Sequence, residues 1–187
     1  MKDLFKYINN LSPIDEIATG DLMKVLKIKT LQKNDYLVRS NEVCKYLYFI
    51  DQGLTKTFFY KSEKQFIMRF FKEKEMFTIL DSYLTQSPSN FMIMALEPTS
   101  VVCIPQDEMA GLCQKHHCVE TFFRKLLSLA SINMMVRISE MLEENATERY
   151  NHFLSDNNLL LQRISLGDLA CYLGITQVSL SRIRAKK

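Results

Sequence analysis

The sequence has no tryptophan, only five glycines and four prolines among 187 residues, and no long apolar run. So little glycine and proline excludes collagen-like and low-complexity architectures. No apolar stretch approaches the roughly 18 to 20 residues that a membrane-spanning helix requires. The N-terminal segment, 1–10, lacks the uninterrupted apolar region of a secretory signal. We therefore expect a cytoplasmic protein that has no membrane partner.

The cysteines do not form a recognisable framework. The chain has five, at irregular spacing: Cys44, Cys103, Cys113, Cys118 and Cys171. An odd number at such spacing indicates reduced thiols in place of a disulfide scaffold. The segment 113–118 also holds His116 and His117, but its spacing is not that of a zinc site, and a helix end with favourable histidines explains it equally. We predict no metal and no cofactor.

Positive charge is concentrated at the C-terminal end. Residues 1–120 contain 15 basic and 15 acidic side chains, whereas residues 121–187 contain nine basic and six acidic ones. No acidic residue follows Asp168, and the last six positions hold four cations: Arg182, Arg184, Lys186 and Lys187. Such a stretch is either an anion-binding surface or a solvated tail.

The chain divides into three zones by its periodicity. Residues 1–25 have helical spacing, and Ser12 and Pro13 are expected to provide the N-cap and first residue of a second helix. Residues 26–105 contain short β-rich runs separated by turn signals. The predicted strands are 28–31, 36–38, 46–50, 54–60, 66–71, 91–96 and 101–104. Their spacing predicts an antiparallel sandwich or barrel, with Asn34 and Asn41 at turn positions of positive φ.

Helical periodicity returns after residue 105, and Thr121–Leu142 is the longest predicted helix. One stripe of this helix is apolar at three- and four-residue steps: Phe123, Leu127, Ala130, Met134, Ile138 and Met141. Further apolar residues widen that surface, so we expect the helix to contact its own β domain and a second copy of the chain. The alternative is a central helix buried within one monomer.

Residues 165–184 have the form of a helix-turn-helix. Ser165 is expected to cap the first helix, Gly174 to give the left-handed turn, and Thr176 to cap the second helix. The predicted anchors of the second helix are Val178, Leu180 and Ile183. The residues left on its outside suit contact with bases and phosphates: Thr176, Gln177, Ser179, Ser181, Arg182 and Arg184. The alternative is an ordinary helical hairpin with a polar face.

Together these segments resemble the Crp/Fnr family of bacterial transcription regulators over nearly the whole chain. Residues 33–53 are similar to the family's glycine-punctuated β-roll motif, with Asn34 and Asn41 where glycines are usual. Three further segments resemble the branch common in Bacteroidetes-type bacteria: 148–154, 170–176 and 180–184.

The resemblance implies an α+β fold with an antiparallel β-roll, the double-stranded β-helix. It also implies three parts: a cyclic-nucleotide-binding-like domain (1–115), a dimerisation helix (116–144) and a helix-turn-helix domain (145–187). The implied partners are double-stranded DNA, a second copy through Thr121–Leu142, and RNA polymerase. By the same resemblance, Gln177 and Arg182 contact bases, while the residues placed at phosphates are Thr176, Ser179, Arg184, Lys186 and Lys187.

The β-roll departs from relatives that bind cyclic AMP. Those proteins use a Gly-Glu pair and a later Arg, whereas here the corresponding positions fall near Thr78 and Ile79 and near Ser89 and Asn90. No basic residue lies between Lys74 and Lys115, so a buried phosphate would lack a cationic partner. We expect that the effector, if there is one, is not cyclic AMP. The candidate residues for another ligand are Asp81, Ser82, Ser87, Ser89 and Asn90; the alternative is a pocket filled by Phe77, Tyr83 and Phe91.

No catalytic constellation or phosphate loop stands out, so we predict that the protein is not an enzyme. Two other functions stay open. In the first, the protein is a ligand-binding β-roll module whose helical domain mediates protein contacts. In the second, it is a haem or iron–sulfur redox sensor.

Overall fold

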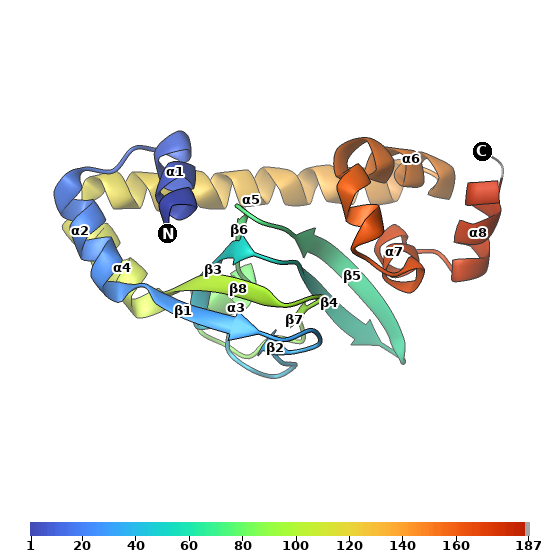
Figure 1. Ribbon diagram of the computed structural model, residues 1–187, viewed down its shortest axis with the longest axis horizontal. Helices are drawn as coiled ribbons and strands as arrows, with labels where there is room; N and C mark the ends of the chain where they lie inside the picture. The colour runs from blue at the N-terminus through green and yellow to red at the C-terminus, as the bar shows by residue number, and fades with distance from the viewer. Residues whose placement is uncertain (186–187) are drawn as a thin grey trace.

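A computed structural model describes residues 1–185 and places two antiparallel sheets alongside one long helix, with a helical unit at that helix's C-terminal end (Figure 1). Lys186 and Lys187, both predicted to contact DNA, lie outside the described residues. None of the helices within residues 1–185 combines the length and apolar character that crossing a lipid bilayer requires.

The two sheets form the β-roll, and every strand pairing in them is antiparallel. The first sheet has the order β1 (Lys27–Leu31), β8 (Thr99–Pro105), β3 (Tyr46–Gln52), β6 (Met76–Phe77). The second has the order β2 (Tyr36–Val38), β7 (Met92–Ala95), β4 (Thr55–Lys61), β5 (Lys64–Phe71). Each of the seven predicted runs overlaps one of these strands, most of them with bounds shifted by one or two residues, which confirms the predicted antiparallel architecture. Strand β6 was not predicted, because two residues are too few for a periodic signal.

The turns of the roll need unusual backbone conformations at a few positions. Asn34 and Asn41 have φ angles of 72° and 64°, as predicted. Gly53 has a φ of 101°, and a Cβ at this position would lie 2.4 Å from Oγ1 of Thr99. Glycine is therefore required here both by conformation and by the close approach of the β7–β8 turn.

Two helices precede the roll, α1 (Lys2–Leu11) and α2 (Glu16–Val25). The predicted capping role of Ser12 and Pro13 is wrong. Ser12 instead ends α1, donating its backbone N–H to Ile8 O at 2.8 Å. The N-cap of α2 is Asp15, whose carboxylate accepts the Ala18 N–H at 2.8 Å. Aspartate caps as well as serine does, and it lies nearer to the first helical residues.

The long helix α5 (His117–Glu143) follows α4 (Gln106–Lys115), while a short helix, α3 (Leu80–Thr85), lies between β6 and β7. Helix α5 is longer than the predicted Thr121–Leu142 because the chain bends only at His116, which ends α4 and begins α5. Nε2 of His116 lies 3.0 Å from Asp21 on α2, which ties this bend to the N-terminal helices.

The first half of α5 packs on the roll. Val119, Phe122 and Leu126 are buried there with residues of α1 and β3. The second half runs alongside β5 toward the head (Figure 1), and many of its apolar side chains are exposed in the single chain. These are Leu129, Ile132, Met134, Met135, Val136, Ile138, Met141 and Leu142.

The C-terminal helical unit, hereafter the head, comprises residues 146–185. Its elements are α6 (Ala146–Asn157), the 3₁₀ helix η1 (Asn158–Gln162), α7 (Leu166–Leu173) and α8 (Gln177–Ala185). Asn145 and Glu148 form a capping box at the start of α6. The head shares a hydrophobic cluster with the second sheet, where Phe70 of β5 packs against Phe153 and Tyr172. The division into domains at 115 and 144 stays a prediction.

Candidate nucleic-acid interface

Helices α7 and α8 are short and are joined by a tight turn. Ser165 Oγ accepts the Asp168 N–H at 3.0 Å, and Thr176 Oγ1 accepts the Ser179 N–H at 3.1 Å. Gly174 ends α7 in the left-handed conformation, with a φ of 72°. Each of these three local features agrees with the sequence expectation.

One of the predicted anchors of α8 is wrong. Leu180 is 1% exposed and Ile183 is half-buried, but Val178 is 61% exposed. Each residue turns the helix by about 100°, so a side chain two positions before Leu180 lies about 200° away from it. Val178 therefore belongs to the outward face and adds an apolar group to it.

The outward face of α8 carries most of the predicted DNA-contacting residues in exposed positions. Thr176, Gln177, Ser181, Arg182 and Arg184 are exposed, while Ser179 is half-buried and its hydroxyl lies 3.0 Å from that of Thr176. Within residues 1–185, neither Arg182 nor Arg184 forms an ion pair or a hydrogen bond. These two guanidinium groups are therefore free for an anionic partner.

Gln177 lies at the first position of α8 and close to the start of α7. A Cβ at Gly167 would lie 2.8 Å from Nε2 of Gln177, so the side chain passes directly over this glycine. No hydrogen bond holds the Gln177 amide to any described residue. The absence of a side chain at Gly167 thus makes room for an amide whose donor and acceptor groups remain available.

The candidate ligand residues of the roll lie together in the segment between β6 and β7. Ser82 is buried; its Oγ accepts the Cys44 N–H at 2.8 Å and donates to Ser87 O at 2.6 Å. Ser89 is also buried and donates to the exposed Asp81 at 3.3 Å. The polar groups of these four residues therefore bond mainly to one another and to the backbone, and only Asn90 is exposed without such a bond among the described residues.

Aromatic side chains occupy much of the surrounding space. Phe77 stacks on Phe71 with ring centroids 4.3 Å apart. Tyr83 is 1% exposed and faces Phe123 of α5, and burial raises its pKa. Phe91 is half-buried against Phe59.

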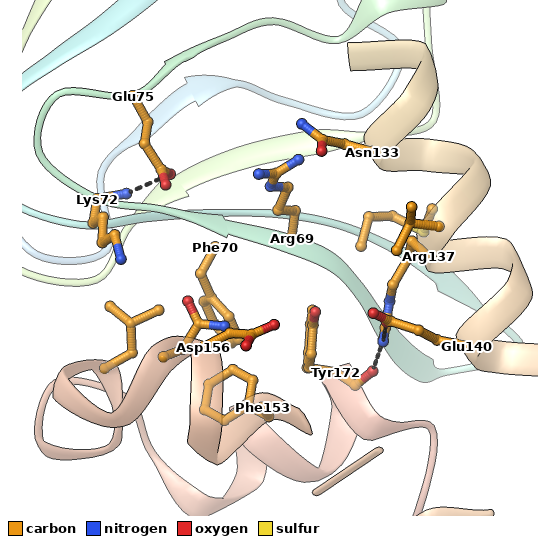
Figure 2. A pocket seen from close by; sticks show the side chains of 14 residues that line it. Arg69, Phe70, Lys72, Glu75, Asn133, Arg137, Glu140, Phe153, Asp156 and Tyr172 are labelled. Atoms are coloured by element: carbon orange, nitrogen blue, oxygen red, sulfur yellow. Dashed lines mark hydrogen bonds and ion pairs between the residues drawn. The ribbon is translucent and has the colours of Figure 1, made fainter. Parts of the chain in front are cut away.

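A cavity of about 330 Å³ lies between the second sheet, α5 and the head (Figure 2). Arg69, Lys72 and Glu75 line it from the roll, Arg137 and Glu140 from α5, and Asp156 from the head. Arg137 stacks on the ring of Tyr172, with its guanidinium carbon 3.9 Å from the ring centroid. Cationic and anionic groups balance in this lining, so it favours no single class of ligand.

The cysteine–histidine segment is used in ordinary contacts. His116, Lys115 and Lys24 surround Asp21. Their hydrogen bonds, the one from Lys115 most of all, lower the pKa of the Asp21 carboxyl. Cys118 donates to Asp15 at 3.3 Å. Residues 1–185 contain no group of three or more side chains arranged to hold a metal ion.

Residues 28–116 match the family model described as the cyclic nucleotide-binding domain. The β-roll has that domain's fold. A comparison with curated proteins finds no significant match.

Solved structures resemble this chain far beyond the roll. A transcriptional regulator described as a Crp/Fnr family member from Eubacterium rectale has a TM-score of 0.75 at 16% identity, covering 93% of this chain and 85% of that one. FixK2 from Bradyrhizobium japonicum has a TM-score of 0.73 at 16% identity, covering 87% and 84%. The c-di-GMP-responsive regulator CLP from Xanthomonas campestris has a TM-score of 0.72 at 13% identity, covering 92% and 91%. At these identities the likeness establishes a shared fold.

Proposed function

We propose that this protein is a DNA-binding transcription regulator of the Crp/Fnr type that acts as a homodimer. The observation that carries the proposal is the outward face of α8, which presents free cationic and polar side chains from a well-anchored helix. The fold shared with Crp/Fnr regulators supports the same conclusion. The Bacteroidetes-like branch, RNA polymerase as a partner and the existence of an effector stay predictions from the sequence.

The second half of α5 supports the homodimer. Met134, Met135 and Ile138 are 51%, 66% and 49% exposed in the single chain, together with five further apolar residues of the same helix segment. Exposed apolar side chains gathered on one helix segment mark an interaction site. If two α5 helices packed in parallel, each would bury the exposed apolar residues of the other. The two heads would then lie side by side, as binding to a two-fold symmetric DNA site requires.

In this dimer each α8 enters the major groove of one half-site, the two grooves lying one turn of DNA, about 34 Å, apart. Gln177 and Arg182 are the residues proposed to read bases, because an amide can pair with adenine and a guanidinium with guanine. Phosphate contacts are proposed for Thr176, Ser179 and Arg184, with Ser181 at either type of group. Lys186 and Lys187 would add to the electrostatic attraction.

We also propose that cyclic AMP is not the effector. Where relatives that bind cyclic AMP have the glutamate of the Gly-Glu pair, this chain has the buried Ile79. Where they have the arginine, it has Ser89, which is hydrogen-bonded to Asp81. A ligand phosphate in this segment would meet no cation from its own loop.

The dimer proposal can be tested with a matched pair of substitutions. Met134→Glu places a charge on the apolar surface of α5, and Met23→Glu places the same charge on α2 at nearly the same exposure, 52% against 51%. We expect Met134→Glu to yield monomers by light scattering and to weaken binding to a palindromic duplex. Met23→Glu should remain dimeric and bind normally. A wild-type monomer at micromolar concentration would contradict the homodimer.

Binding to DNA itself is tested by retention on nonspecific duplex at several salt concentrations. A protein that neutralises phosphates loses affinity steeply as salt rises. A head that contacts only proteins would not be retained by the duplex at low salt, which would contradict the DNA-binding proposal.

A further inference from the structure

The head is joined to the roll by a largely buried ion pair at the start of α7. Nζ of Lys56, on β4, lies 2.5 Å from Oδ1 of Asp168, and the two side chains are only 6% and 15% exposed. Lys56 also donates to Gln65 Oε1 at 3.2 Å. A buried cation needs such partners, because removal from water is costly without them. This pair therefore joins the start of α7 to β4 of the second sheet.

A second ionic contact joins the head to one end of the roll. The guanidinium of Arg163, between η1 and α7, donates to Glu73 at 2.7 and 2.9 Å and to Glu97 at 2.7 and 3.3 Å. Glu73 lies in the β5–β6 turn and Glu97 in the β7–β8 turn. Glu73 also accepts the backbone N–H of Gly53, in the β3–β4 turn, at 2.9 Å. Three turns of the roll thus converge on one arginine of the head.

The other end of α7 is held from α5 and α6. Arg137 donates to the carbonyl of Tyr172, and Arg149 donates to the carbonyl of Leu173 at 3.1 Å. Cations interact favourably with the unpaired carbonyls at a helix C-terminus. Figure 2 shows Arg137 reaching from α5 toward this end of α7. Helix α7 is therefore fixed at both ends, by the roll at its start and by the dimer helix at its end.

These contacts leave the outward face of α8 uncovered. Arg182 and Arg184 remain exposed while α7 is held against the roll. A contact that kept the head from DNA by masking would bury this face. The docked arrangement is consequently compatible with DNA binding.

We propose that two contacts, the Lys56–Asp168 pair and the Arg163 contacts with Glu73 and Glu97, are positioning contacts that hold the head in its DNA-binding placement on the roll. We call them the clamp. The proposal rests on the proposed function as a dimeric DNA-binding protein. Its consequence for regulation is direct: a change in the β5–β6 or β7–β8 turn of the roll moves the carboxylates that hold Arg163, and so moves α8.

The clamp should act on the spacing of two heads and not on the affinity of one. A palindromic duplex requires both α8 helices at a fixed separation, so heads that are already placed lose less freedom on binding. A duplex with one half-site imposes no such separation. Loss of the clamp should therefore weaken binding to the full site and leave binding to the half-site unchanged.

The test uses Lys56→Met and, as a second variant, Arg163→Gln. Methionine keeps the apolar stem of Lys56, and Asp168 retains a hydrogen bond from Ser165 Oγ at 2.8 Å. The matched control is Lys64→Met, which removes an exposed lysine of the neighbouring strand β5 that has no ion pair among the described residues. The probes are a palindrome selected from random DNA with wild-type protein, and a duplex carrying one of its half-sites.

We expect either clamp variant to lose roughly tenfold or more in affinity for the palindrome, about 1.4 kcal/mol, with unchanged half-site affinity. Hydrogen exchange should rise in residues 146–185 but not in the roll, and Lys64→Met should behave as wild type. Unchanged or tighter binding to the palindrome would overturn the clamp, as would equal losses on both duplexes. If the wild-type protein bound neither duplex at low salt, the proposed function would fail instead.

Discussion

Two polar surfaces of this protein have similar compositions but use their side chains in opposite ways. The segment between β6 and β7 contains serines, an aspartate and an asparagine, and most of these groups bond to one another. The outward face of α8 contains hydroxyls, an amide and two arginines, and its arginines and amide have no partner among residues 1–185.

The difference lies in what each surface must still satisfy. Buried polar groups are costly unless they are hydrogen-bonded, so Ser82 and Ser89 serve the fold of their own segment. Exposed groups without partners keep their capacity for another molecule. A list of polar residues therefore does not identify a binding surface, whereas counting their existing hydrogen bonds separates the two cases.

The largest expected effect concerns cyclic AMP at the β6–β7 segment. A missing charge-assisted bond to a phosphate costs about 1.5 to 3 kcal/mol, or roughly 10- to 150-fold in affinity. Calorimetry should show weak or no binding to the wild type. Asn90→Arg places a cation at an exposed position of the segment and should strengthen any binding. A wild-type dissociation constant in the low micromolar range would show that this surface is open after all.

Specific recognition by α8 can be separated from general attraction with Arg182→Ala and Arg184→Ala. Arg182→Ala should cost about 1 to 3 kcal/mol on the selected palindrome and relax base preference at one position of each half-site. Arg184→Ala should weaken selected and random duplexes equally and reduce the salt dependence by about one unit of slope. Titrations at several salt concentrations measure both. Equal losses on both duplexes for Arg182→Ala would identify it as a phosphate contact.

Stability should respond to serine removal in only one of the two surfaces. Ser82→Ala leaves the buried Cys44 N–H without its partner and should lower the free energy of unfolding by about 1 to 3 kcal/mol. Ser181→Ala removes an exposed hydroxyl and should change it by less than about 0.5 kcal/mol. Denaturant unfolding of both variants makes the comparison. A stable Ser82→Ala protein would mean that this segment does not depend on its internal bonds.

The last expected effect, smaller than that of Ser82→Ala, comes from two left-handed helix ends, one in each region. Gln86 ends α3 with a φ of 51°, and Gly174 ends α7 with a φ of 72°. Gln86→Gly should stabilise the protein by less than about 1 kcal/mol, because relief of a disfavoured backbone conformation is partly offset by loss of the 2.7 Å hydrogen bond from Gln86 Nε2 to Tyr83 O. Gly174→Ala should destabilise it by a similar amount, since its Cβ would also lie 3.1 Å from Met141 Cε. Thermal melts that moved in the same direction for both variants would contradict this account.

Local signals in the sequence predicted much of this arrangement. Alternating β-rich runs gave the strands, Asn34 and Asn41 gave two turns, and Ser165, Gly174 and Thr176 gave the α7–α8 geometry. Each of these features depends on neighbours a few residues away. Exposure along α8 agrees with the prediction except at Val178, where apolar character alone indicated burial, and at Ser179, which is half-buried.

The contacts between the roll and the head could not be predicted in the same way. Lys56 and Asp168 are brought together only by the folded chain, and nothing near either residue indicates its partner. Arg163 likewise meets carboxylates from two distant turns. Arg149 lies in a segment that resembled the regulator family, but its contact with the carbonyl of Leu173 is visible only in three dimensions.

The pairing of β1 with β8 also determines when the roll can be completed during synthesis. Strand β1 lies at the edge of its sheet, and the one strand paired with it within residues 1–185, β8, is the last of the roll to leave the ribosome. Until then its backbone groups are unpaired, a situation that promotes association with other chains. Lys27 and Lys29 keep this edge charged and exposed throughout. All strands of the second sheet precede the head in the chain, so they can pair before the head is synthesised.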